Sequence, residues 1–271
     1  MSFTQGRTYL YRGSAFGFAA QFDHPSKATI PTQAMAVLAP TGGEAFSTVR
    51  NFDYQNIITF DEASAYAVGS EDPDGSHHSV ATVAVRNFRF LNVIEADLVT
   101  MRVASVHRPR GEARDETIEE GEVTLTGSCI HGLRIACQPI DLTFRTELFA
   151  EHPTFDRFVK GGRDAGKCYA HGSAEKGLIV TSIVERIAGC QALSDDERKN
   201  LFNPRFALSG IRCSRNAVFV PGFGRIVIGE VIIERGYRRI NMLRIELGCG
   251  NAGTGTVGGG EGNGAEIPPA T

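Results

Sequence analysis

A phrase of thirteen residues occurs twice in this chain, and the repeat limits what the chain can fold into. It reads VRNFDYQNIITFD at 49–61 and VRNFRFLNVIEAD at 85–97. The copies share Val-Arg-Asn-Phe, a later Asn, an Ile and an Asp without a gap, so one structural unit is reused. We interpret each copy as two extended segments joined by a bend near Asn56 or Asn92, with the second segment starting near Asp61 or Asp97. Two copies are fewer than a solenoid array needs.

The residues after each copy alternate between apolar and polar. In LVTMRVASV, Val99, Met101 and Val103 fall on one face and Thr100 and Arg102 on the other, which is typical of a half-buried antiparallel strand. We therefore expect the repeats 49–70 and 85–106 to lie side by side in one sheet, each covering the apolar face of the other.

The segment after the first copy has small residues on the face that corresponds to Val99, Met101 and Val103. Ala63, Ala65 and Ala67 stand there in place of larger side chains. This face must lie close to another backbone or to a ligand, or be loosely filled.

A period of two dominates the apolar pattern, and sustained helical stripes are absent. The sequence therefore predicts an all-β fold, an antiparallel sandwich or flattened barrel built on the duplicated strand-bend-strand unit. We expect a single β domain over 1–247 and, because a glycine-rich segment buries little apolar area, a flexible tail over 248–271.

The span 150–205 is expected to be a partly helical insertion with two short helices. One lies in SDDERKNLFNP, where Ser194 and Glu197 have the spacing of a capping box. The other lies in PTFDRFVKGG, with Pro153 near its start and Gly161 after its end.

The clearest hairpin lies near the C-terminus. GRIVIGEVIIE leads into the turn RGYR, and RINMLRIEL returns with Leu243, Ile245 and Leu247 inward and Arg244 and Glu246 outward. The strand Ile226–Ile233 is apolar on both faces, so it should be central in its sheet or covered twice.

The bulk composition excludes some classes of protein. The 271 residues are 42% hydrophobic, with a formal charge of −3 and a pI near 6.2. Such a chain buries a core but lacks the basic footprint of a nucleic-acid binder. No apolar run has the roughly 18 residues of a spanning helix, and the first residues lack the pattern of a signal peptide. As given, the chain reads as a cytoplasmic protein.

Two clusters are candidate sites. Asp72, Asp74, His77 and His78 crowd one loop and have side chains that hold divalent cations, although Asp-Pro-Asp-Gly is also common in plain turns, which is the favoured reading. A second cluster, Arg235, Arg238 and Arg239, occupies the C-terminal hairpin tip. It is most simply a solvated loop, and the alternative is a contact with a partner of opposite charge.

Other motifs carry no chemistry. The stretch 161–168 has the glycines and Lys of a phosphate-binding loop, but Cys168 replaces the Ser or Thr that such a loop needs. Cys168 and His171 lack a second pair of metal ligands, and the six cysteines read as free thiols. We find no nucleophile elbow, so the sequence predicts no catalytic residue and no cofactor.

Several phrases point to a family. RGSAFGFAAQF, HSVATVAVRNFRFLNVIEADLVTMRVASV, TGSCIHGLRIACQPIDLTF and VPGFGRIVIGEVIIERG follow one another along most of the chain. In this order they resemble the bacterial choice-of-anchor P family. The resemblance implies a secreted or surface-anchored β domain without an assigned activity, which is the alternative to a cytoplasmic location. The chain departs from it in its segment 150–205 and in showing no export signal.

Two functions remain open at this stage. The first is a non-catalytic structural or binding role, with a homo-oligomer or a protein partner held through strand edges supplied by the strand Ile226–Ile233 and the tail. The alternative is an enzyme or small-ligand carrier with a pocket lined by Ala63, Ala65 and Ala67.

Overall fold

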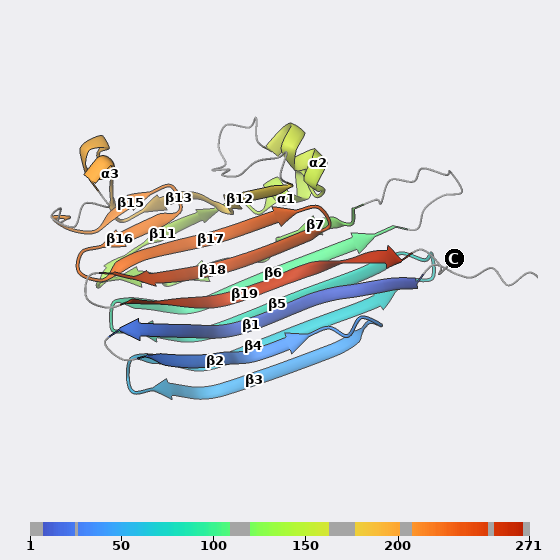
Figure 1. Ribbon diagram of the computed structural model, residues 1–271, viewed down its shortest axis with the longest axis horizontal. Helices are drawn as coiled ribbons and strands as arrows, with labels where there is room; N and C mark the ends of the chain where they lie inside the picture. Colours follow the sequence, from blue (N-terminus) through green and yellow to red (C-terminus); the bar gives the residue numbers. More distant parts are fainter. Residues whose placement is uncertain are drawn as a thin grey trace, which may run out of the picture.

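The structure is an antiparallel β-sandwich, which confirms the predicted fold class. This computed structural model describes residues 8–24, 27–108, 120–162, 177–200, 208–248 and 252–267. Two large sheets lie face to face, and Figure 1 shows the sheet of β17, β18, β19, β1 and β2 in front of the sheet of β6, β5, β4 and β3.

The front sheet, sheet A, is assembled from both ends of the chain. Its order is β14-β15-β16-β17-β18-β19-β1-β2, and β12 also pairs with β17. The strands are β1 (Thr8–His24), β2 (Ala28–Val37), β12 (Leu178–Ser182), β14 (Gln191–Ala192), β15 (Arg212–Ser214), β16 (Ala217–Val220), β17 (Gly224–Glu234), β18 (Tyr237–Leu247) and β19 (Ala252–Ile267).

The second sheet, sheet B, contains both copies of the repeated phrase. Its order is β10-β9-β6-β5-β4-β3, and β7 and β8 also pair with β6. The strands are β3 (Gly43–Tyr54), β4 (Ile58–Glu71), β5 (His77–Phe90), β6 (Ile94–His107), β7 (Glu122–Thr124), β8 (Cys129–His131), β9 (Arg134–Ile135) and β10 (Gln138–Pro139). The copies lie side by side as expected, but sheet A, not the other copy, covers their apolar face.

The remaining elements lie at the rim opposite β3 (Figure 1). β11 (Asp141–Phe144) pairs with β13 (Val184–Ala188), and the helices are α1 (Glu147–Glu151), α2 (Phe155–Arg157), the π-helical turn η1 (Phe158–Gly162) and α3 (Asp195–Asn200). Both expected helical segments are present, but Gly161, which was expected after the end of the first in the chain, lies inside η1. In α3, Ser194 and Glu197 form the reciprocal bonds of a capping box. The span 150–205 is nevertheless more than an insertion, because β12 pairs with β17 inside sheet A.

The repeated phrase encodes a tight turn. Gln55 and Asn56 have φ of 53° and 55°, and Leu91 and Asn92 have φ of 50° and 51°, as the two central residues of a type I′ turn require. The Leu91 amide donates to the Ile57 carbonyl at 2.7 Å, so the turns are stacked on each other.

A third turn of the same geometry follows, although the sequence around it does not contain the repeated phrase. Ala136 and Cys137 have φ of 46° and 65°, and the Ala136 amide donates to the Val93 carbonyl at 2.7 Å. The unit therefore occurs three times along the edge of sheet B. The sequence did not reveal the third copy because its turn residues differ.

A second shared feature is a backbone kink that crosses each sheet as a row. In sheet B the register places these residues directly opposite one another on neighbouring strands: Asn51, Asp61, Asn87, Asp97 and Gly132. In sheet A the corresponding row is Ala34, Gly17, Gly258, Met242 and Gly229. Alternate members have positive φ in each row, namely Asn51, Asn87 and Gly132 in sheet B and Ala34, Gly258 and Gly229 in sheet A.

The kinks explain which residues the two copies share. Asn tolerates the left-handed region better than most residues, and Asn87 Nδ2 donates to Asp61 Oδ2 across the strands at 2.6 Å. At each kink the inward face shifts by one residue: Phe60 and Ala63 are both buried, and two outward residues lie between them. The shared Asn and Asp are therefore residues of the bend.

The glycine-rich C-terminal segment is the central strand β19, so the expectation of a flexible tail is wrong for residues 252–267. It pairs with β18 on one side and with β1 on the other. Its main chain therefore forms hydrogen-bonded ladders on both edges, which composition alone does not reveal.

The glycines of β19 make room for the large side chains of β6. A Cβ on Gly258 would lie 3.0 Å from Val99 Cγ1, and one on Gly262 would lie 2.8 Å from Val103 Cγ1. A Cβ on Gly260 would overlap the Met101 methyl group. Side chains of sheet B thus fill the space beneath a strand that has almost none of its own.

The hairpin of β17 and β18 forms as predicted, and Leu243 and Ile245 are fully buried. β17 is central, because it pairs with β18 on one side and with β16 and β12 on the other.

We expect Gly260→Ala to destabilise the protein by about 1–3 kcal/mol, because its methyl group would meet Met101 and would lie 2.8 Å from the Ser14 carbonyl oxygen. Urea unfolding followed by circular dichroism measures the change. The matched control is Gly255→Ala, whose Cβ meets nothing closer than 3.7 Å. Equal losses in the two variants would contradict this packing. Adding Met101→Ala to Gly260→Ala should cost less than the sum of the single changes.

A second prediction concerns the kink at Asn87. Asn87→Ala should cost about 1–3 kcal/mol, because Ala is disfavoured at the positive φ and the bond to Asp61 is lost. Asn87→Gly keeps the backbone conformation and should cost less than Asn87→Ala in the same unfolding assay. If Gly were as costly as Ala, the conformation of Asn87 would not be the reason for its presence.

Candidate functional site

The predicted metal quartet does not assemble around one point. His78 Nε2 lies 3.1 Å from Asp72 Oδ2, but Asp74 Oδ1 accepts the Ser76 amide at 2.8 Å. That amide lowers the pKa of Asp74. His77 contacts Tyr9 and Tyr11 of β1. In the described ranges no three His, Cys, Asp or Glu side chains are placed to hold a metal ion.

His77 is instead part of an aromatic cluster. Its ring stacks on Tyr9 with 4.0 Å between the centroids, and its Nδ1 shares a hydrogen bond of 2.9 Å with the Tyr11 hydroxyl. Burial, together with Glu71 and Asp72, raises the pKa of Tyr11. His77 therefore ties β5 to β1.

The arginine cluster at the hairpin tip is split. Arg238 is 1% exposed, so it is not the solvated residue that we expected. Its Nη1 lies 2.9 Å from Glu120 Oε1 and donates to the Glu234 carbonyl at 2.7 Å, while Nη2 donates to the Pro153 carbonyl at 3.3 Å. Burial lowers the pKa of Arg238, and Glu120 opposes that shift. Arg238 thus binds the hairpin to the loop before α2.

The other two arginines lie at the surface but also have partners within the chain. Arg235 contacts Asp156 at 3.0 Å and lies over the Phe155 ring at 5.4 Å. Arg239 donates to the Tyr237 hydroxyl at 3.1 Å and lies 3.4 Å from Glu261. The cluster therefore does not present three free cations to a partner.

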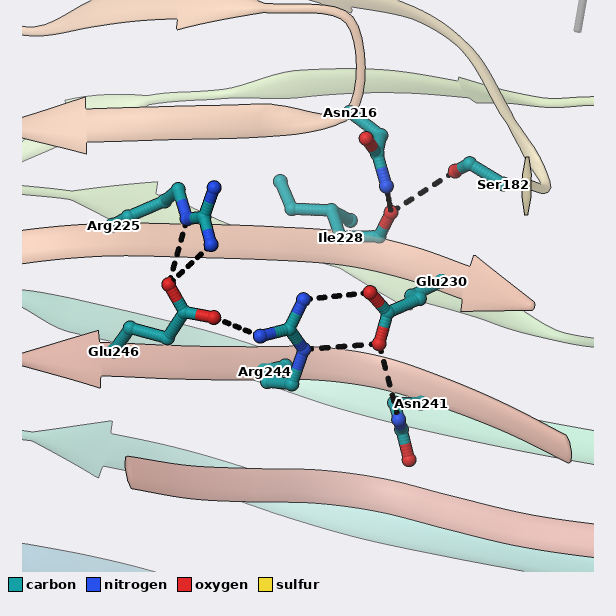
Figure 2. Close-up of polar contacts among 8 residues, drawn as sticks. All are labelled: Ser182, Asn216, Arg225, Ile228, Glu230, Asn241, Arg244 and Glu246. Carbon is teal, nitrogen blue, oxygen red and sulfur yellow. Dashed lines mark hydrogen bonds and ion pairs between the residues drawn. The ribbon is translucent and has the colours of Figure 1, made fainter. Parts of the chain in front are cut away.

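A charged network crosses β17 and β18, as Figure 2 shows. Arg244 binds Glu230 through two hydrogen bonds of 2.6 and 2.9 Å and also contacts Glu246. Arg225 Nε donates to Glu246 at 2.7 Å, and Asn241 donates to Glu230 at 3.4 Å. Both carboxylates are occupied by guanidinium groups, as in a structural ion-pair network.

Figure 2 also shows the hydrogen-bond partners of the Ile228 carbonyl, which precedes the kink at Gly229. The Ile228 carbonyl accepts both Ser182 Oγ and Asn216 Nδ2 at 3.1 Å. The Ile183 amide in turn donates to the Gly229 carbonyl at 2.9 Å. The Ile228 and Gly229 carbonyl groups at the kink therefore have hydrogen-bond donors from outside the ladder of β17 and β18.

The small face proposed as a pocket lining is packed. Ala63, Ala65 and Ala67 are all 0% exposed. A Cβ on Gly17 of β1 would lie 2.7 Å from Ala63 Cβ. The two sheets therefore approach closely here, which is the first of the explanations given for the small residues.

Four of the six cysteines lie among the described residues, and Cys168 and Cys249 lie outside them. Cys129, Cys137, Cys190 and Cys213 are free thiols. Burial, with Cys213 nearby, raises the pKa of Cys190 to about 12. The pair Cys168 and His171 lies outside the described residues, as does most of the stretch 161–168.

The long strand edges differ in how they are protected. β2 carries an exposed Pro31 with an adjacent register shift, and Ala34 kinks it at a φ of 50°. Pro, bulges and kinks all hinder pairing with another strand. The other described edge strands, such as β10, β12 and β14, have two to five residues. These edges offer little to a partner.

β3 is the exception. It has twelve residues, and in the described part of the chain it pairs with β4 alone. Residues 43–50, which we call the open edge, contain no Pro or Lys and precede the kink at Asn51. Phe46 in its middle is 70% exposed. The sequence did not identify this edge, because which strand ends a sheet depends on the topology.

The candidate site is therefore the open edge of β3. The strand Ile226–Ile233 and the C-terminal segment, which were expected to supply a free edge, are paired on both sides. No helix in the described ranges is long and apolar enough to cross a membrane.

The contrast between Arg238 and Arg235 gives a prediction. Arg238→Met should destabilise the protein by about 3–5 kcal/mol, because it leaves the Glu120 carboxylate buried without its cation. Arg235→Met removes an exposed pair and should cost at most about 1 kcal/mol. Urea unfolding compares the two. The variant Arg238→Met/Glu120→Met should be more stable than Arg238→Met alone, and a double variant that is less stable would contradict the explanation.

Comparison with known proteins places the chain in one family. A search of the curated proteins and a search of the solved structures each found no match. A family model described as a domain of unknown function, DUF8256, matches residues 9–169, which include most of β1, all of β2 and the three stacked turns. Because the match covers more than half of the 271 residues, the chain belongs to the DUF8256 family.

Proposed function

We propose that this protein is a non-catalytic structural or binding β protein that associates through the open edge of β3. The observation that carries the proposal is this unpaired edge, in a molecule whose other long edge, β2, is obstructed. An edge strand presents unpaired amide and carbonyl groups that another strand can pair with.

Three further observations support this proposal. The ion-pair network of β17 and β18 is closed on itself, because its four charged members, Arg225, Glu230, Arg244 and Glu246, bind one another. The small face between the sheets is packed. The exposed Phe46 is also an apolar contact that strand addition would cover.

The test is sedimentation velocity of the full chain over a wide concentration range. We expect concentration-dependent association, and Phe46→Lys should weaken it at least about tenfold, or about 1.4 kcal/mol, because charges on an edge oppose pairing. The control is Val37→Lys, which removes a 54% exposed apolar residue from β2 and should leave association unchanged. A wild-type chain that stays monomeric, or variants that behave alike, would overturn the proposal.

A further inference from the structure

We infer that the partner at the open edge is a second copy of this chain, with β3 pairing antiparallel to β3 of the other copy about a twofold axis at Ser47. The inference rests on the proposed function. It adds the identity of the partner, the register and the side chains that meet.

The first step is the arrangement of side chains on β3. Glu44, Phe46, Thr48 and Arg50 alternate with Ala45, Ser47 and Val49. Ala45, Ser47 and Val49 lie opposite Ala67, Ala65 and Ala63, which are fully buried, so this set belongs to the inner face. Glu44, Phe46, Thr48 and Arg50 therefore share the outer face, with one charge of each sign near its ends.

The second step is symmetry. In an antiparallel pair about a twofold axis, two positions face each other when they lie equally far on either side of the axis. Glu44 and Arg50 are each three residues from Ser47. A twofold axis there places Glu44 opposite Arg50 of the second copy and, by symmetry, makes the same pair again.

The third step is the apolar contact. In this register Phe46 faces Thr48 of the second copy, and the two Phe46 side chains are diagonal neighbours. Diagonal positions on adjacent strands are about 7–8 Å apart, within reach of aromatic rings. Phe46, which is 70% exposed in the single chain, would be covered by its own equivalent.

Neighbouring registers lose the two Glu44–Arg50 pairs, although an axis at Phe46 would keep the contact between the two Phe46 side chains. Moving the axis to Phe46 places Glu44 opposite Thr48, and moving it to Thr48 places Arg50 opposite Phe46. Both moves leave the charges without a partner of opposite sign across the interface. An axis between two residues would set outer-face positions against inner-face ones.

Arg50 already has one partner within the chain. Its Nε donates to Glu62 of β4 at 2.8 Å, and its side chain is 72% exposed. A guanidinium group has five N–H donors. Arg50 can therefore donate to Glu62 of its own chain and, on the open side, also donate to Glu44 of the second copy.

The test is charge reversal, read by sedimentation and by native mass spectrometry. Glu44→Arg and Arg50→Glu should each weaken self-association about tenfold or more, since each sets like charges opposite one another twice. An equimolar mixture of the two variants should restore association as a heterodimer, because each Arg then faces a Glu. The double variant E44R/R50E should associate within about threefold of the wild-type chain.

The matched control is Glu62→Gln, which breaks only the pair within the chain and should leave association within about threefold. If the single variants weaken association and their mixture does not restore it, the register is wrong while the proposed edge association stands. If Phe46→Lys has no effect on association, the edge itself is excluded and both proposals fail. Recovery in the mixture cannot result from misfolded chains, because two damaged chains would not repair each other.

Discussion

β19 is the strand on which the rest of the sandwich depends. It joins β18, from the C-terminal hairpin, to β1, from the start of the described chain, so without it sheet A divides into two parts. Hydrogen bonds along both edges hold it in place, each contributing on the order of 1 kcal/mol. Its glycines let the two sheets come close, and the larger residues Val99, Met101 and Val103 of β6 fill the space below it. Elsewhere the close approach uses small residues on both sheets, with Gly17 on β1 against Ala63 on β4.

The kinks are the second constraint, and they account for the repeated phrase. A kink in one strand disturbs its neighbours unless they bend at the same place, so the kinks form a row across each sheet. Where side chains support the row, Asn and Asp do so, as in the bond from Asn87 to Asp61. Glycine occupies a position in the row where a Cβ atom would clash with a neighbouring main chain or side chain. Gly132 is an example, because any Cβ there would overlap Asp97.

The open edge differs from the other candidate sites in whether its polar groups have partners within the chain. His77, Arg238 and Glu230 were each plausible functional residues by type, and each is held by neighbours within the chain. The open edge differs because, among the described residues, the main chain of 43–50 pairs with β4 on one side only. That free edge is the basis of the proposed association, and the placement of Glu44 and Arg50 at equal distances from Ser47 is the basis of the proposed pairing with a second copy.

Local sequence patterns are enough to predict the all-β class, the side-by-side repeats, the C-terminal hairpin and the capping box of α3, because each depends on periodicity or on residues close together in the chain. The third turn was missed because Ala136 and Cys137 adopt positive φ without the Asn of the other copies. The role of β19 was missed because glycine composition predicts flexibility, whereas its order comes from pairing with strands far away in the sequence. The burial of Arg238 and the exposure of the β3 edge were decided only by tertiary structure. Which strand lies at an edge, and which charge lies under a loop, depends on contacts between distant segments that no local pattern records.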